Sequence, residues 1–205
     1  MSLEIMFGIN ASGKDSLVKE LKSKRSNVET TTETRLLMYH LGYISDFRAE
    51  APVDKASYKA LENTPQSRVI ETTNSIYKEK LGAFSESETE YFLLSHLVFA
   101  LTIDKDKPIY LTDRPVPPWY RDISRKLIQV VCDPDEILRR RLKDKDTGVR
   151  DRGNMDSLEE IVKHQSLCNI EWQKLIGGLP ESRYITIVNN DSKIAVNELE
   201  NFLNK

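Results

Sequence analysis

The sequence has few of the features that mark secreted or membrane-spanning proteins. It contains only two cysteines, Cys132 and Cys168, whose spacing fits neither a disulfide framework nor a metal motif. The longest apolar stretch, residues 91–101, is interrupted by Ser95 and His96 and falls well short of a membrane span. No signal peptide is visible at the amino terminus. We therefore expect a cytoplasmic protein with two buried thiols and no membrane contact.

An excess of charge of one sign is also absent. Lys and Arg number 30 and Asp and Glu number 32, which leaves a net charge of −2. This balance gives no electrostatic footprint for duplex nucleic acid, so any anion site has to be built locally. The length of 205 residues suits one α/β domain, and we expect a single domain over residues 1–205.

Short apolar runs alternate with amphipathic segments along the chain. The candidate strands are residues 3–7, 28–30, 109–111, 127–131 and 184–188. Residues 91–101 follow the capping pattern Ser87-x-x-Glu90 and are apolar on nearly all sides, which predicts a central buried helix. Strands that alternate with helices imply a parallel sheet covered on both faces. Residues 43–83 are polar and are interpreted as a helical insertion.

Residues 8–14 read Gly-Ile-Asn-Ala-Ser-Gly-Lys and fit the pattern G-x-x-x-x-G-K between a strand and a helix. The glycines let the backbone curl so that successive N–H groups face phosphate oxygens. The helix adds its N-terminal partial positive charge. A lysine here bridges the terminal phosphates and offsets charge that develops during transfer. The predicted nucleotide-binding residues are Gly8, Asn10, Ala11, Ser12, Gly13, Lys14, Asp15 and Ser16.

Asp15 departs from this pattern, because the position after the lysine usually carries Ser or Thr. A carboxylate beside a triphosphate is repelled unless a cation lies between them. Three interpretations stay open. Asp15 helps to hold Mg²⁺ directly or through water, or it points away while Ser16 approaches the metal, or it marks weakened catalysis.

An acid also follows the apolar strand at residues 109–111. Ligands bind at the carboxyl ends of strands in open parallel sheets, so Asp113 is a candidate for orienting hydrated Mg²⁺. Arg114 is a candidate for gripping the acceptor or the transferred phosphoryl group. The alternative is a turn-initiating Asp followed by a solvated Arg.

Arginines cluster in the third quarter of the chain. Asp135 and Glu136 lie four residues before Arg139 and Arg140, and such pairs stabilise an exposed helix. Helix pairing does not explain Arg150 and Arg152, which lie in a polar segment between two helices. We interpret this segment as a flap whose arginines close over phosphates; a solvated loop is the alternative.

Taken together, the sequence resembles the nucleoside monophosphate kinases, and most closely the archaeal-type adenylate kinases. The phosphate loop and Asp113 are two of the matching features. The other matching segments are residues 37–42, 46–48, 132–140, 147–152, 158–165 and 187–191.

The resemblance implies a five-stranded parallel sheet of order 2-3-1-4-5, an acceptor-binding insertion at residues 43–83 and a small LID at residues 144–154. It implies that Lys14 acts on the transferred phosphoryl group together with Arg140, Arg150 and Arg152. Arg48 and, more weakly, Arg35 would meet the acceptor. Asn189 and Asn190 would lie near the adenine of the donor.

We therefore expect an enzyme that moves the γ-phosphoryl group of ATP, with Mg²⁺, to a nucleoside monophosphate or a related small acceptor. The alternatives are a regulatory ATPase with no small acceptor and a catalytically weakened binding module. A GTPase is disfavoured because no Asn-Lys-x-Asp motif is present; the segment at residues 189–191 reads Asn-Asn-Asp.

Overall fold

The structure is a computed structural model. It describes residues 2–48, 51–65, 67–69, 71–72, 75, 89–96, 99–104, 107–111, 121, 124–148 and 156–205. The principal elements follow in the order β1 (Ser2–Phe7), α1 (Lys14–Lys24), β2 (Val28–Thr32), α2 (Glu33–His40), α3 (Lys55–Glu62), β3 (Glu90–Ser95), β4 (Phe99–Asp104), β5 (Lys107–Leu111), β6 (Lys126–Val131), α6 (Pro134–Asp146), α7 (Leu158–Ile176), β7 (Tyr184–Val188) and α8 (Ser192–Leu203).

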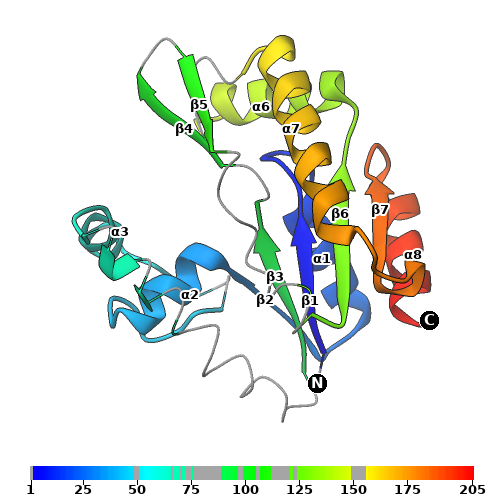
Figure 1. The fold of residues 1–205 in the computed structure, drawn as a ribbon, viewed down its shortest axis with the longest axis horizontal. Coiled ribbons are helices and arrows are strands. Elements are labelled where there is room, and N and C mark those ends of the chain that lie inside the picture. The colour runs from blue at the N-terminus through cyan, green and yellow to red at the C-terminus, as the bar shows by residue number, and fades with distance from the viewer. Residues whose placement is uncertain are drawn as a thin grey trace.

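Five strands form one parallel sheet in the order β2-β3-β1-β6-β7 (Figure 1). Numbered along the chain within this sheet, the order is 2-3-1-4-5, so the predicted fold class is confirmed. The central strand β1 pairs with β3 on one side and β6 on the other; Ile5 lies opposite Leu93 and Leu127. All five carboxyl ends therefore meet at one edge, where the loop after β1 begins.

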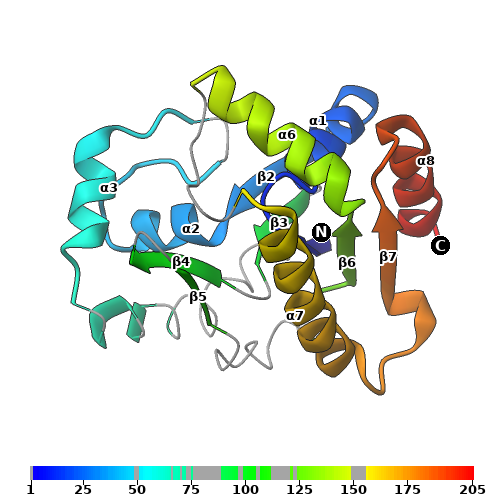
Figure 2. The ribbon, with the colours of Figure 1, turned by 90° about the horizontal axis from the view of Figure 1, so that it is seen from above.

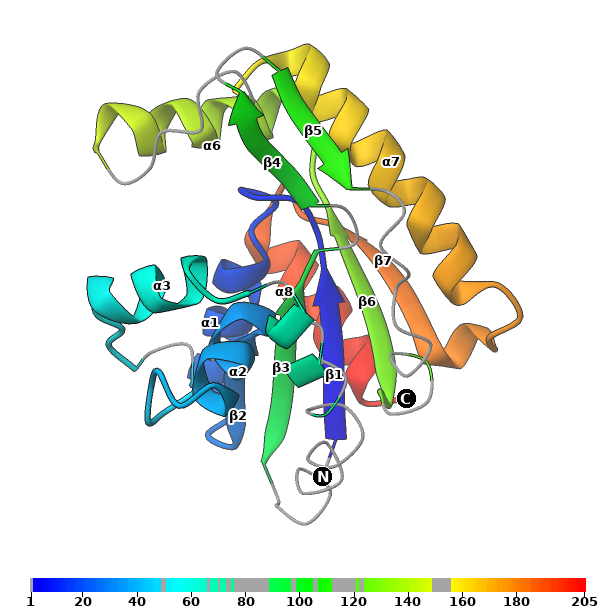
Figure 3. The same ribbon diagram turned by 60° about the vertical axis from the view of Figure 1, so that its left-hand side comes forward.

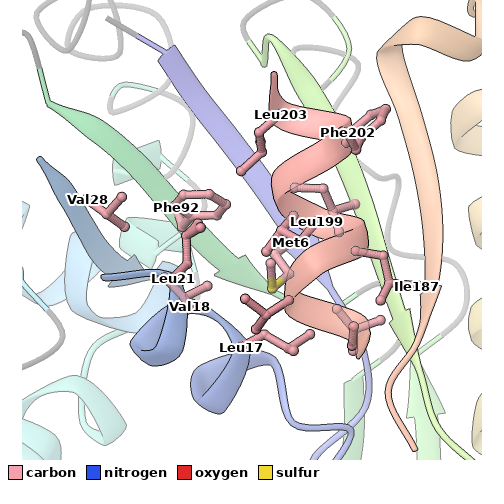
Figure 4. Close-up of a cluster of buried hydrophobic side chains, with 14 of the residues drawn as sticks. Met6, Leu17, Val18, Leu21, Val28, Phe92, Ile187, Leu199, Phe202 and Leu203 are labelled. Atoms are coloured by element: carbon pink, nitrogen blue, oxygen red, sulfur yellow. The ribbon is translucent and has the colours of Figure 1, made fainter. Parts of the chain in front are cut away.

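Helices cover both faces of the sheet and enclose two hydrophobic cores. Figure 2 shows α1 and α8 on one side and α7 on the other. Under α1 and α8, Met6 and Phe92 pack with residues of both helices (Figure 4). On the other face Phe7 packs on Trp172 of α7, with ring centroids 5.9 Å apart. In the part of the chain that the structure describes, no helix has the length and apolar character needed to cross a membrane.

Capping side chains fix where several helices begin. Thr32 accepts a hydrogen bond from the N–H of Arg35 at the start of α2, and Ser157 does the same for Glu160 at the start of α7. Such caps satisfy N–H groups that have no partner within the helix. Both starts have a local sequence signal, the run of threonines at residues 30–32 and the capping pattern Ser157-x-x-Glu160.

The helix predicted at residues 91–101 is wrong. Residues 90–95 form strand β3, and residues 99–104 form strand β4. Phe92 and Leu94 face the core under α1 and α8, whereas Leu93 faces the core under α7. A strand buried on both faces is a continuous apolar run, and periodicity alone does not distinguish it from a buried helix segment.

The strand predicted at residues 109–111 exists, but its predicted place in the parallel sheet is wrong. It belongs to β5, which pairs antiparallel with β4 in a separate two-stranded sheet. Figure 3 shows this hairpin extending beyond the carboxyl ends of the central strands. The third strand of the parallel sheet is β3. Asp113, which was predicted to follow a strand of that sheet, lies outside the described residues.

Strand β3 gives the fold a direct test. Phe92 is 0% exposed, so replacing it with alanine removes a large side chain from a closed core. We expect Phe92→Ala to lower the free energy of unfolding by about 3–5 kcal/mol in a denaturant titration. The control is Ile194→Ala, whose side chain is 67% exposed, with an expected change of less than about 0.5 kcal/mol. Equal small effects would contradict the assignment of β3.

Candidate functional site

The predicted phosphate loop connects the carboxyl end of β1 to the first turn of α1. Gly13 is the N-cap of α1 with φ of 88°, and Ala11 also has a positive φ of 69°. A Cβ atom on Gly8 would lie 2.6 Å from the carbonyl oxygen of Val130, and one on Gly13 would lie 2.1 Å from Nδ2 of Asn189. The loop therefore requires glycine at both positions that the motif specifies.

Side chains from distant elements bind three successive carbonyl groups of this loop. Arg141 donates from Nε and Nη2 to the carbonyl of Asn10, at 3.4 and 3.2 Å. Arg140 donates from Nη1 to the carbonyl of Ala11 at 3.3 Å. Asn189 donates from Nδ2 to the carbonyl of Ser12 at 2.9 Å. These contacts add to the loop's own hydrogen bond, from the N–H of Ser12 to the carbonyl of Ile9 at 3.2 Å, in holding its conformation.

The first turn of α1 adds N–H groups to the site. The first N–H groups of a helix have no partner within it, and the glycine N-cap offers no side-chain acceptor. Asp15 and Ser16 lie in this turn, and both are exposed. Together with the helix dipole, this end of α1 has the geometry of an anion site.

Lys14 is buried behind the loop. Its side-chain Nζ donates to the carbonyl of Gly8 at 2.5 Å and to that of Ile9 at 3.3 Å. Burial lowers the pKa of Lys14 to about 8, and the nearby Asp15 carboxylate offsets only part of that effect. An ammonium group held this way is poorly solvated, so a phosphate group would be a better partner for it.

The three arginines of α6 have different surroundings. Arg139 is exposed and forms an ion pair with Glu136 at 2.6 Å, not with the predicted Asp135. Arg140 also pairs with Glu136, at 2.8 Å, as predicted. These two guanidinium groups lower the pKa of Glu136 to about 2. Arg141 is 1% exposed and lies 3.9 Å from the carboxylate of Asp156.

A cleft of about 980 Å³ opens at the carboxyl edge of the sheet. One wall is the phosphate loop with α6, and the opposite wall is the start of α2 with α3 and the end of β3. The lining residues are Ile9, Asn10, Ala11, Gly13, Lys14, Asp15, Ser16, Thr32, Glu33, Thr34, Arg35, Tyr58, Leu94, His96, Glu136, Arg139, Arg140, Lys143, Asp144, His164, Asn189 and Ser192.

Glu33 brings a carboxylate to the wall opposite the loop. It is the first residue of α2 and directly follows β2. Ser95, the last residue of β3, donates from Oγ to Glu33 Oε1 at 2.9 Å. Ser95 is 1% exposed and lies opposite Phe7, the residue before the loop, in the parallel pairing of β3 with β1. The sheet therefore fixes the position of this carboxylate relative to the loop.

Two of the three predicted acceptor arginines, Arg35 and Arg48, lie next to each other, but only Arg35 lines the cleft. Arg35 donates from Nη1 to the carbonyl of Arg48 at 2.7 Å. Among the described residues, Arg35 is part of the cleft wall and Arg48 is not. The Arg48 side chain is exposed and pairs with Asp46.

The segment after β7 was predicted to lie near the donor base. Asn189 is 1% exposed and lies beneath the loop. Asn190 Oδ1 accepts from the N–H of Asp133 at 2.8 Å, and Asp191 caps the start of α8. Four other predicted site residues, Asp113, Arg114, Arg150 and Arg152, lie outside the described residues.

Sequence reasoning missed several residues that line the cleft. Glu33 directly follows β2, but that strand reads Val-Glu-Thr-Thr-Thr and lacks the apolar run that marked the strand before Asp113. His96 follows β3, whose misassignment as a helix hid its position at the edge of the sheet. Tyr58, Lys143 and His164 reach the cleft through tertiary packing, for which the sequence carries no local signal.

The chain is similar to known proteins in its fold and not in its sequence. No protein-family model matches the chain, and no curated protein matches its sequence. Among solved structures, a shikimate kinase from Bacteroides thetaiotaomicron aligns with a TM-score of 0.57 at 11% identity, over 100% of this chain and 99% of that one.

Two further structures align over the whole of this chain. A shikimate kinase from Acinetobacter baumannii in complex with shikimate has a TM-score of 0.57 at 10% identity, with 94% of that chain covered. A sugar kinase from Janibacter sp. has a TM-score of 0.50 at 9% identity, with 95% covered. At such identities the likeness concerns the fold alone, and this chain has the fold of the P-loop kinases.

Proposed function

We propose that this protein is a phosphotransferase that moves the γ-phosphoryl group of ATP to a small acceptor. The observation that carries the proposal is the cleft itself, which has the phosphate loop and Lys14 on one wall and Glu33 and Arg35 on the other. Phosphoryl transfer needs mainly positioning and charge neutralisation, and both walls supply groups for it. The kinases that share the fold are consistent with this function.

The donor wall would bind the triphosphate through the loop amides and the ammonium of Lys14. Arg140 lines the same wall, and its charge would add to the attraction for phosphates. The prediction that Arg150 and Arg152 neutralise charge in the transition state stays a prediction. A triphosphate that reached Lys14 would replace the carbonyls of Gly8 and Ile9 as its partners.

The residues at the start of α1 fit Mg²⁺. Asp15 offers a carboxylate and Ser16 a hydroxyl, and both line the cleft. No cluster of three or more His, Cys, Asp or Glu side chains suited to a metal occurs among the described residues. Mg²⁺ is usually held by one or two protein oxygens together with water and substrate phosphates, and Asp15 and Ser16 would supply the protein oxygens. When bound, the ion would neutralise charge on the phosphates.

The acceptor wall favours an acceptor with a hydroxyl group. Glu33 is oriented by Ser95, and an ionised carboxylate accepts more than one hydrogen bond. In the proposed reaction the hydroxyl oxygen attacks the γ-phosphorus as its proton passes to Glu33. The bond from the γ-phosphorus to the bridging oxygen breaks, and ADP leaves.

A nucleoside monophosphate is the second candidate acceptor, as in adenylate kinases. Its phosphate would bind Arg35, with Arg48 beside it, and the segment 43–83 would contribute Tyr58 of α3, which lines the cleft. A phosphate acceptor needs no base, and the Glu33 carboxylate would repel it. An acceptor screen by coupled detection of ADP, with alcohols, nucleosides and nucleoside monophosphates, decides between the two. Hydrolysis of ATP unaffected by any acceptor would instead favour the regulatory ATPase.

Replacing Lys14 tests the donor wall. We expect Lys14→Met to lower turnover roughly 100-fold or more, because the charge that meets the developing negative charge is lost. The fold should survive, since the substitution removes a buried ammonium and keeps the side-chain volume. Steady-state kinetics and circular dichroism measure the two effects. Lys19→Met on the exposed face of α1 is the matched control; equal losses in both variants would count against the proposal.

The lowered pKa of Lys14 predicts a pH dependence of nucleotide binding. In the ligand-free protein the amine loses its proton above about pH 8, whereas bound phosphates favour the charged form and raise the pKa. Binding between about pH 8 and 10 should therefore take up a proton, and the Kd for ATP should rise by up to about tenfold per pH unit. Calorimetry in buffers of different ionisation enthalpy measures the proton taken up on binding, because the observed heat then depends on the buffer. A Kd that does not change over this range, or one that changes equally in Lys14→Met, would be the contrary result.

Replacing Glu33 tests the acceptor. We expect Glu33→Gln to reduce kcat by about 10²–10⁴-fold with a hydroxyl acceptor, because the amide does not take the proton. Ser95→Ala should cause a smaller loss, since it only frees the carboxylate. Glu198→Gln on the exposed face of α8 is the control. If a nucleoside monophosphate is the acceptor, Glu33→Gln will leave kcat nearly unchanged, and the hydroxyl assignment fails.

A further inference from the structure

The three side chains expected near the donor base are already engaged within the protein. Asn189 binds the carbonyl of Ser12, Asn190 binds the N–H of Asp133, and Asp191 accepts from the N–H groups of Lys193 and Ile194. Side chains that read a base have to leave donors or acceptors facing the ligand. In this segment the Asn189 NH₂ group and the Asn190 and Asp191 side-chain oxygens instead bind the scaffold around the loop. The Asn189 Oδ1 has no hydrogen-bond partner among the described residues, but it is buried, so it does not face a ligand either.

Asn189 is held through both its backbone and its side chain. Its backbone N–H donates to the carbonyl of Val131 at 2.8 Å, and its own carbonyl accepts from Arg140 at 3.0 Å. Its side chain is fixed between strand β7 and the loop, so that a Cβ atom on Gly13 would lie 2.1 Å from its Nδ2. At 1% exposure, a base does not reach this amide unless the loop moves.

The orientation of the Asn189 amide follows from its partner. The carbonyl of Ser12 is an acceptor, so only the NH₂ side of the amide can face it. Ser12 is 0% exposed, and a buried carbonyl that loses its donor costs more than an exposed one. The contact between Asn189 and Ser12 therefore stabilises the loop conformation just before Gly13 and Lys14.

We infer that Asn189 positions the phosphate loop and does not read the base of the donor. It acts through the carbonyl of Ser12, so its loss alters the amides that meet the phosphates and affects every ligand that carries them. The inference rests on the proposed function for the identity of the ligand as a triphosphate. It assigns Asn189 to phosphate affinity, in place of the adenine contact expected from the sequence.

The test compares three ligands that share a triphosphate and differ in the base. Calorimetry with Mg²⁺ gives the Kd of ATP, GTP and inorganic tripolyphosphate for the wild type and for Asn189→Leu, which keeps the branched outline without the donor. We expect about a tenfold weakening for all three ligands and an unchanged ratio of ATP to GTP affinity. Amide hydrogen exchange over residues 8–14 should be faster in the ligand-free variant, which a base contact would not cause.

Thr186→Val is the matched control, because it removes one side-chain hydrogen bond of β7, to Gln129, at an exposed position. It should leave all three Kd values unchanged. Asn189→Ala is the second variant if Asn189→Leu does not fold. Loss of folding in both would overturn the inference, since Asn189 would then be a residue of the core. A loss confined to ATP, with tripolyphosphate unaffected, would overturn it as well.

The same experiment tests the proposed function separately from the role of Asn189. If the wild type binds neither ATP nor tripolyphosphate, the phosphate site is refuted. Hydrogen exchange in the ligand-free variants would still report whether Asn189 holds the loop, and unchanged exchange over residues 8–14 would refute that role.

Discussion

Three consecutive carbonyl groups, those of Asn10, Ala11 and Ser12, are bound from outside the loop by Arg141, Arg140 and Asn189. The rest of the site depends on these contacts. Fixing one residue's backbone costs about 1–2 kcal/mol in conformational entropy, and positive φ at Ala11 adds steric cost. The sheet order offsets these costs, because it places β6, which leads into α6, directly beside β1, and β7 next to β6. The fold is thus the means by which a short loop is held ready for an anion.

The same arrangement accounts for the burial of Lys14. An ammonium removed from water is costly, and the carbonyls of Gly8 and Ile9 compensate for only part of this, as the lowered pKa indicates. Protein sites that are strained or poorly satisfied without ligand are typical of function, since binding then relieves the cost. A bound polyphosphate would stabilise the protonated form of Lys14 and would supply oxygen atoms that accept its hydrogen bonds. Binding of a polyphosphate would therefore recover the free energy that burial of the Lys14 ammonium costs.

Local signals were enough to predict much of the fold. The loop motif, the caps at Thr32 and Ser157 and the five-stranded order all followed from patterns within a few residues or from the resemblance to nucleotide kinases. β3 was misassigned because it is buried on both faces, with Phe92 and Leu93 in different cores, and so lacks the alternation that marks a strand.

The site was less predictable, for a different reason. Asn189 and Ser12 are 177 residues apart in sequence, so no spacing rule connects them. The roles of Arg140 and Arg141 depend on the rotation of α6 about its axis, which tertiary packing sets. Glu33 follows β2, whose end lies at the ligand-binding edge, but the polar sequence of that strand, Val-Glu-Thr-Thr-Thr, hid its position.

The two walls of the cleft come from different halves of the chain. The residues that hold the loop follow β6, whereas Glu33, Arg35, Tyr58 and His96 all precede it. β1 is the point at which the strand order reverses, and ligands bind beside such a point because the connections on its two sides diverge. The walls proposed for donor and acceptor therefore belong to separate parts of the chain, and one fixed link joins them. Ser95 holds Glu33 and lies opposite Phe7, so a slip of β3 by one residue would move the carboxylate and turn Ser95 to the other face. The register of β3 against β1 thus sets the position of the Glu33 carboxylate relative to Lys14.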